Sequence, residues 1–185
     1  MITRNYYASM CATAIVDGEG PASLSIRDIS GKYLIPENNQ VLGGGSQGSR
    51  PNLSLMPKQV SNSVGLCFGT SDAEESVEDY TLSFANFGSV AGAYQQPVYN
   101  AENNNYTITR RFVLSNTTAS AITVKEFGIL GLMSADYTYG TTQANILLYR
   151  KKLDNEFTIE ANETVNFDLT VTYNMPVEYA PYVPA

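Results

Sequence analysis

The stretch VNFDLTVTY, residues 165–173, alternates apolar and polar side chains over its whole length. A period of two residues is typical of a β-strand with one buried face and one face in water. The sequence therefore predicts a half-buried antiparallel strand here. The side chains expected to face the core are Val165, Phe167, Leu169, Val171 and Tyr173.

Further strand-like segments precede this one along the chain. Short apolar or alternating runs, separated by polar turns, occupy residues 63–68, 80–87, 105–115, 121–132, 145–151 and 156–160. Regular spacing of this kind favours stacked or rolled antiparallel sheets over alternating strands and helices. We predict a mainly β fold, an antiparallel β-sandwich or flattened barrel of about seven to nine strands, with its core in residues 62–173.

The first residues differ from this pattern. Apolar side chains recur there at helical spacing, at Tyr7, Met10, Cys11, Ala14 and Ile15. Thr3 is a residue type that can cap a helix N-terminus. We therefore predict a short amphipathic helix within residues 1–16, and we expect both cysteines, Cys11 and Cys67, to be buried free thiols.

Two segments have too few periodic apolar residues to fold by themselves. Residues 36–58 are rich in glycine and proline, and residues 176–185 contain three prolines. We predict that both are extended arms of a single domain covering residues 1–185, and that they pair with the sheet edges of adjacent subunits. Their expected anchors are Leu42, Leu53, Leu55, Met56, Tyr179, Tyr182 and Val183.

Composition excludes several functions. The chain has 11 Lys and Arg against 18 Asp and Glu, a net charge of −7, which argues against nucleic-acid binding. It has no His, so mechanisms that use an imidazole base or ligand are absent. No segment approaches the ~20 apolar residues of a membrane span, and no secretory signal is visible. We expect a protein that is not an enzyme, holds no cofactor and does not bind membranes.

Two loops contain residues that could suggest a ligand. The acidic segment 72–79 could hold a cation, but it lacks the spacing of a known calcium loop, and a solvated turn is the favoured interpretation. The glycine-rich segment 43–48 is not followed by the Lys and Ser or Thr of a phosphate-binding loop.

One charged pair stands out in the predicted sheet. If residues 106–114 and 122–130 form a hairpin, their apolar faces coincide only in registers in which the numbers of facing residues sum to an even value, and the register that sums to 236 places Phe112 opposite Val124. That register places Arg110 opposite Glu126, and it predicts a structural ion pair on the core side.

Three motifs follow one another along the chain. They are VGLCFGTS with the later DYTL (64–71 and 79–82), YTITRRF with NTTASAITVKEFGI (106–112 and 116–129), and LLYR with FTIEANETVNFDLTVTY (147–150 and 157–173). Taken in order, they resemble motifs of β-rich virion structural proteins of tailed bacteriophages, among tail, neck and head-associated components. The N-terminal MITRNYY is similar to the start of the same proteins. The Lys151-Lys152 pair after Arg150 departs from that pattern, in which an acidic residue is expected.

The resemblance implies a non-enzymatic structural subunit located in the virion and made in the host cytoplasm. Its expected position is a ring or sleeve of the tail or neck, and its expected partners are copies of itself and other virion proteins. The alternatives are a head-fibre or capsid-decoration protein, or a carbohydrate- or receptor-binding module. The last would use the tyrosine-rich loops at residues 94–106 and 137–140.

Overall fold

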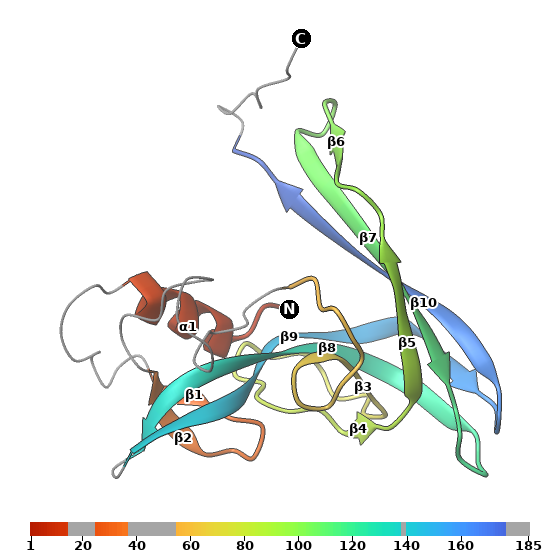
Figure 1. Ribbon diagram of the computed structural model, residues 1–185, viewed down its shortest axis with the longest axis horizontal. Helices are drawn as coiled ribbons and strands as arrows, with labels where there is room; N and C mark the ends of the chain where they lie inside the picture. Colours follow the sequence, from red (N-terminus) through yellow and green to blue (C-terminus); the bar gives the residue numbers. More distant parts are fainter. Residues whose placement is uncertain (15–24, 37–54, 138–139, 177–185) are drawn as a thin grey trace.

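The computed structural model describes residues 1–14, 25–36, 55–137 and 140–176. Within these ranges the chain forms one helix and a set of antiparallel strands (Figure 1). In order, these are α1 (Arg4–Ala14), β1 (Ile26–Arg27), β2 (Tyr33–Pro36), β3 (Gly65–Gly69), β4 (Phe84–Ala85), β5 (Gly88–Tyr94), β6 (Val98–Asn100), β7 (Asn105–Ser115), β8 (Ile122–Tyr137), β9 (Gly140–Ile159) and β10 (Thr164–Asn174).

The first sheet has six strands built around β8. Strand β9 pairs with β8 along one edge, and β2 and β3 pair with its other edge. Strands β1 and β4 extend the sheet beyond β2 and β3. Every residue of β3 is buried, because Leu66 and Phe68 belong to one apolar cluster and Cys67 belongs to another with Leu82, Leu130 and Leu147.

The second sheet has four strands centred on β7. Strand β10 pairs with one edge of β7 over eleven residues without a register shift. Strands β5 and β6 follow one another along the other edge, with a register shift between Ala91 and Tyr94. The predicted inward and outward faces of β10 are confirmed from Val165 to Val171, whereas Tyr173 is 43 % exposed.

The core lies between the two sheets. Phe167 of β10 meets the rings of Phe68 and Phe127 at centroid distances of 5.0 and 5.5 Å, both edge to face. Phe112 and Leu114 of β7 are fully buried in the same cluster. The predicted mainly β, antiparallel fold with a short N-terminal helix is thus confirmed. The sheets are open, so it is the sandwich alternative and not the barrel that the structure supports.

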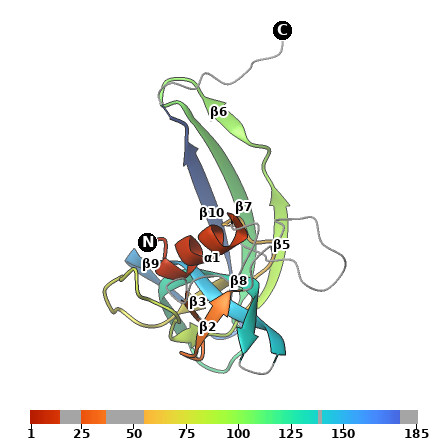
Figure 2. The same cartoon turned by 90° about the vertical axis from the view of Figure 1, so that its left-hand side faces the viewer.

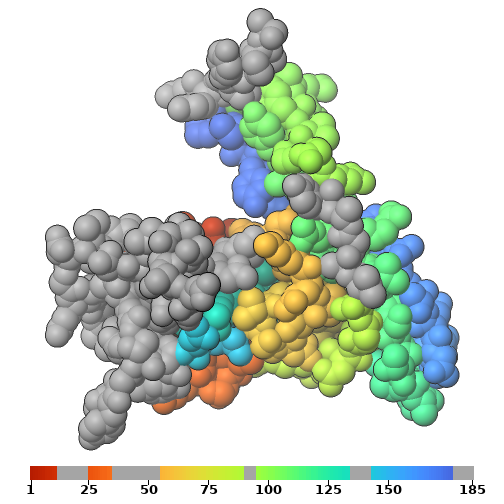
Figure 3. Space-filling model, in the orientation of Figure 1, coloured from red at the N-terminus to blue at the C-terminus, as the bar shows by residue number. Residues whose placement is uncertain are grey.

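Part of the second sheet extends beyond this core. Figure 1 shows β6 with the adjoining ends of β7 and β10 rising away from β8 and β9, and in Figure 3 this part stands above the main body. We call these residues, 98–106 and 173–176, the projecting tip. Val98 there is 62 % exposed, and the rings of Tyr99 and Tyr106 contact each other at a tilt of 42°, with their centroids 5.1 Å apart.

The predicted helix is present as α1 and lies against β9 and β1, but its buried face is rotated by about one residue from the expected stripe. Ala8 is buried and Tyr6 packs against the core, whereas Tyr7 is 56 % exposed. Cys11 is exposed, so the prediction of two buried thiols is correct only for Cys67.

The predicted hairpin of residues 106–114 and 122–130 is wrong, and with it the Arg110–Glu126 ion pair. Strand β7 belongs to the second sheet and β8 to the first, so the connection between them passes from one sheet to the other. Asn116 makes this crossing: its buried amide donates to the carbonyls of Ser120 and Ile159 at 2.8 and 2.9 Å. These bonds tie the connection to the end of β9 and replace a hairpin turn.

Arg110 and Glu126 consequently have other neighbours. Arg110 lies opposite Leu169, and its Nη1 donates to the Pro57 carbonyl at 2.8 Å. Of the arm anchors, Leu55 and Met56 pack against the core, so this end of the predicted arm belongs to the fold of its own chain. The other anchors, Leu42, Leu53, Tyr179, Tyr182 and Val183, lie outside the described residues.

Candidate functional site

The most densely bonded polar group in the described chain is the guanidinium of Arg150, on β9. It is 4 % exposed. It donates to carboxylates of Glu126 and Asp79 at 2.6 and 2.8 Å. It also donates to the carbonyls of Ala73 and Glu74 at 2.9 and 3.0 Å. One side chain therefore joins β9, β8 and the loop that follows β3.

Glu126 completes this buried charge cluster from β8. Its Oε2 accepts from Arg150, and its Oε1 accepts from the Ser83 amide at 3.1 Å. Its side chain lies directly against Gly69 on the neighbouring strand, where an added Cβ would come within 2.7 Å of the Glu126 Cγ. Gly69 is therefore the residue that leaves room for the carboxylate.

One cation, Arg150, faces two carboxylates in the cluster, those of Glu126 and Asp79. Burial disfavours the charged form of Arg150, but the hydrogen bonds and negative charges of Asp79 and Glu126 outweigh it, so the pKa of the guanidinium is raised. Both oxygens of Glu126 are occupied by donors that belong to the chain. Such a cluster fixes the strands that contribute to it relative to one another.

The acidic loop, residues 72–79, lies beside this cluster and faces the chain's own cations. Glu74 contacts Lys152 at 2.5 Å, Glu75 contacts Lys151 at 3.4 Å, and Asp72 contacts Lys125 at 3.5 Å. The pKa values of Lys151 and Lys152 are raised, the first chiefly by the charge of Glu75 and the second by its hydrogen bond to Glu74. In the described chain no group of His, Cys, Asp and Glu side chains is arranged to hold a metal ion.

Glu75 makes this loop sensitive to acid. Burial raises its pKa, but hydrogen bonds from the Met1 amino group and the Lys152 amide outweigh that effect, and the pKa is lowered. Because the folded-state pKa lies below the unfolded one, the stabilisation is present above the ordinary glutamate pKa and is lost as the pH falls through the lowered value.

We expect Glu75→Gln to reduce stability at neutral pH and to flatten the loss of stability below about pH 5, where a free glutamate begins to titrate. Urea unfolding of both proteins across this range measures the difference. Glu78→Gln is the matched control, because Glu78 is 63 % exposed and meets Arg4 only at 3.4 Å. Equal acid sensitivity of the Glu75 variant and the parent would contradict the assignment.

The residues that carry the sequence resemblance meet at the buried charge cluster. Gly69 and Asp79 come from the first motif, Glu126 from the second and Arg150 from the third. Stretches of the chain that are far apart in sequence are thus brought into contact by a few hydrogen bonds. The cluster gives these motifs a common physical role in holding the first sheet together.

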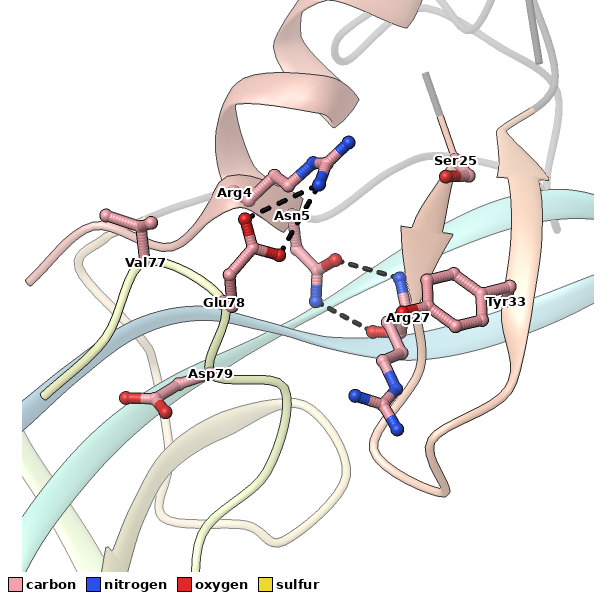
Figure 4. Close-up of a pocket in the computed structure, with 8 residues that line it drawn as sticks. All are labelled: Arg4, Asn5, Ser25, Arg27, Tyr33, Val77, Glu78 and Asp79. Carbon is pink, nitrogen blue, oxygen red and sulfur yellow. Dashed lines mark hydrogen bonds and ion pairs between the residues drawn. The ribbon is translucent and has the colours of Figure 1, made fainter. Parts of the chain in front are cut away.

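The N-terminal motif is anchored in a similar way. The Thr3 hydroxyl donates to the Leu147 carbonyl, so Thr3 binds β9 and does not act as the expected helix cap. The Asn5 side-chain amide donates to the Arg27 carbonyl at 2.7 Å and accepts from the Arg27 amide at 2.8 Å (Figure 4). These contacts fix α1 against β1 and β9.

A polar pocket of about 260 Å³ lies next to these contacts. Figure 4 shows Arg4, with its guanidinium toward Glu78, at one side of the pocket. The Arg27 guanidinium lies 3.6 Å from the centroid of the Tyr80 ring and donates to the Gly31 carbonyl. Both arginines therefore have partners within the chain, and the lining offers no nucleophile paired with a base. The lining residues are Arg4, Asn5, Ser25, Arg27, Tyr33, Val77, Glu78 and Asp79.

A second, apolar groove of about 250 Å³ lies between the two sheets. Residues 169–172 of β10 form one wall, and Phe127, Ile129 and Tyr149 of the first sheet form the other. Ile2 and Leu55 complete it. We call it the inter-sheet groove. None of its lining side chains is charged.

Comparison with known proteins gives no relative. No protein-family model matches the chain, and no curated protein and no solved structure matches it. Within the described residues, no helix has the length and apolar character that crossing a membrane requires.

Sequence reasoning about sites thus had a mixed outcome. Glu126 was singled out correctly as a buried charged residue, but its partner is Arg150 and not Arg110. Arg150 was visible only as part of the LLYR motif, since nothing in its local pattern distinguishes it from a surface arginine. The predicted tyrosine-rich surface is described in part, by Tyr99 and Tyr106 on the projecting tip.

Proposed function

We propose that this chain is a non-enzymatic structural subunit of a tailed-phage virion, a ring or sleeve component of the tail or neck that assembles with copies of itself. The observation that carries the proposal is the meeting of three virion-like motifs at the buried charge cluster around Glu126 and Arg150. The residues of this cluster hold the first sheet together. Proteins that share the fold would need the same residues at these positions, which explains why the resemblance is restricted to the motifs that contain them.

The projecting tip supports an assembly role. It extends beyond the core, carries exposed apolar and aromatic side chains, and has no second sheet against its inner face in the described chain (Figures 1 and 3). Surfaces of this kind are typical of contacts between subunits. The low content of charged residues, 16 %, suits surfaces that become buried on assembly.

A head-fibre, capsid-decoration or receptor-binding role is the second candidate. The contacting pair of Tyr99 and Tyr106 favours it, because tyrosine offers a rigid contact surface with a polar end. The Tyr99 hydroxyl donates to Asn104 at 2.9 Å, which holds its ring in place. In this role the projecting tip would contact a host receptor and not another subunit.

The decisive experiment is to locate the chain in particles. We expect mass spectrometry of purified virions to detect it at many copies per particle, and cryo-electron microscopy to place it in a closed ring at the tail or neck. Density for isolated copies on the capsid surface would favour the decoration role. Absence of the chain from purified particles, with presence in infected-cell lysate, would reject the virion proposal.

A further inference from the structure

In the part of the chain that the structure describes, the outer edge of β10 is open over eleven residues. Strand β10 pairs only with β7, and among the described residues no backbone hydrogen bond reaches its other edge from Thr164 to Asn174. It contains no proline and no register shift, two features by which proteins commonly block an edge. A regular, open edge of this length can accept a further strand.

The corresponding edge of the first sheet is covered. On β9, the Leu148 carbonyl accepts from the Thr3 amide, and the Arg150 amide donates to the Met1 carbonyl, each at 3.0 Å. Further along the same edge, the Ile29 amide donates to the Asn145 carbonyl. The N-terminal residues therefore cover the outer edge of β9, whereas none of the residues described in ranges 1–14, 25–36, 55–137 and 140–176 pairs with the outer edge of β10.

The inter-sheet groove lies directly beside that open edge. Residues 169–172 line it consecutively, although the Thr170 hydroxyl lies on the opposite face, 2.9 Å from Thr109. The groove thus reaches the backbone of β10. Figure 2 shows β10 at the side of its sheet nearest the N-terminus, in agreement with Ile2 being on the groove wall. A strand added here would bond β10 through its backbone and place alternate side chains in the groove.

The C-terminal nine residues, 177–185, have a suitable pattern. Val177, Tyr179 and Val183 share one face of an extended chain, with Pro181 among them. In a strand, successive N–H groups point to opposite sides, so Glu178, Ala180 and Tyr182 can all donate to β10. The missing N–H of Pro181 would then point away from the pairing edge, which is where edge strands tolerate proline.

The described part of the chain directs this segment away from its own groove. The Met175 amide donates to the Asn104 carbonyl at 2.9 Å, and the Asn104 amide donates to the Pro176 carbonyl at 3.1 Å. These bonds hold the end of β10 toward the turn between β6 and β7, on the side opposite the open edge. Occupying its own groove would require the chain to reverse immediately after Pro176.

From these observations we infer that the open edge of β10 and the inter-sheet groove receive residues 177–185 of a second copy of this chain. This inference rests on the proposed function, since it supplies the contact by which subunits join. The contact is head to tail: the tip of one copy gives the segment and the groove of the next receives it. Such contacts generate rings when the rotation closes.

Cross-linking between full-length copies tests the inference. In a Cys11→Ser background, one tagged copy carries Thr172→Cys beside the groove and an untagged copy carries Tyr179→Cys. Cys67 stays unreactive because it is fully buried and burial raises the pKa of its thiol. With a short bismaleimide, we expect a mixed tagged–untagged dimer, at a yield about tenfold above that of Thr158→Cys, an exposed position on the outer face of β9.

Two further variants separate the groove from the edge. Val171→Lys places a charge at the groove and is expected to lower the mixed cross-link about tenfold. Thr170→Lys, the adjacent residue on the opposite face, is expected to leave the yield unchanged. Thermal unfolding of each variant shows that the fold is retained.

The outcomes are distinct. Cross-linking only within one copy, in a Thr172→Cys/Tyr179→Cys chain, would overturn the second-copy contact. No cross-link above the Thr158 control would overturn the docking site altogether. Either result leaves the proposed function standing if the chain is found in particles, whereas absence from particles rejects the proposed function whatever the cross-linking shows.

Discussion

Replacing Glu126 by glutamine is expected to destabilise the protein by about 3–5 kcal/mol, because it breaks a buried ion pair and leaves Arg150 poorly compensated. Glutamine has one oxygen where glutamate has two. Its NH₂ group would therefore face a donor, either the Arg150 Nε or the Ser83 amide. Urea unfolding followed by circular dichroism measures the change.

The control for this variant is an ion pair of the same chemistry at the surface. Arg111 and Asp168 face each other across β7 and β10 at 2.7 Å, with their side chains 58 % and 41 % exposed. Exposed pairs contribute little, so Asp168→Asn is expected to leave the unfolding midpoint close to that of the parent. If the two variants lose the same stability, burial does not determine the importance of the Glu126 pair.

Gly69→Ala is expected to cost about 3 kcal/mol, although it adds a single methyl group. The new Cβ would lie within 2.7 and 2.8 Å of the Glu126 Cγ and Cδ. A free side chain could turn aside, but Glu126 is held at both oxygens, so it can yield only by breaking its bonds to Arg150 or Ser83. Denaturant unfolding of the variant measures this cost.

A double-mutant cycle makes this prediction specific. In a Glu126→Ala background the obstacle is gone, and the added cost of Gly69→Ala is expected to fall below about 1 kcal/mol, a strong coupling between the two sites. Gly88→Ala is the control for glycine replacement in a strand, because its Cβ would find its nearest neighbour at an ordinary 3.6 Å. Additive costs at Gly69 and Glu126 would contradict the steric explanation.

Local patterns in the sequence predicted local structure well. The alternation of residues 165–173 identified the buried face of β10. In a sheet with one face in solvent, every second side chain of a strand packs against the core. The helix within residues 1–16 followed from its spacing, although the rotation of its buried face depended on packing against β9. The interruption expected between residues 151 and 156 is absent: β9 runs unbroken from Gly140 to Ile159, with register shifts in its pairing to β8.

The sequence patterns did not predict which distant segments of the chain pair with one another. A hairpin between neighbours in sequence was the simplest arrangement for residues 106–130, and the parity of apolar residues allowed it. The actual arrangement depends instead on Asn116, whose side-chain amide donates to the Ile159 carbonyl at the end of β9, some forty residues later. The same holds for Arg150, which finds Asp79 and Glu126 from separate parts of the chain. The local spacing of apolar and polar residues does not predict such long-range contacts.

The pairing of the first residues with β9 has a consequence for synthesis on the ribosome. Thr3 bonds Leu147, a partner 144 residues later, so this contact cannot form until β9 has been synthesised. Until then the edge of β9 and the apolar face of α1 have no cover from each other. We expect folding to be slow, as it is for chains dominated by distant contacts, and nascent chains stalled before β9 to depend on chaperones.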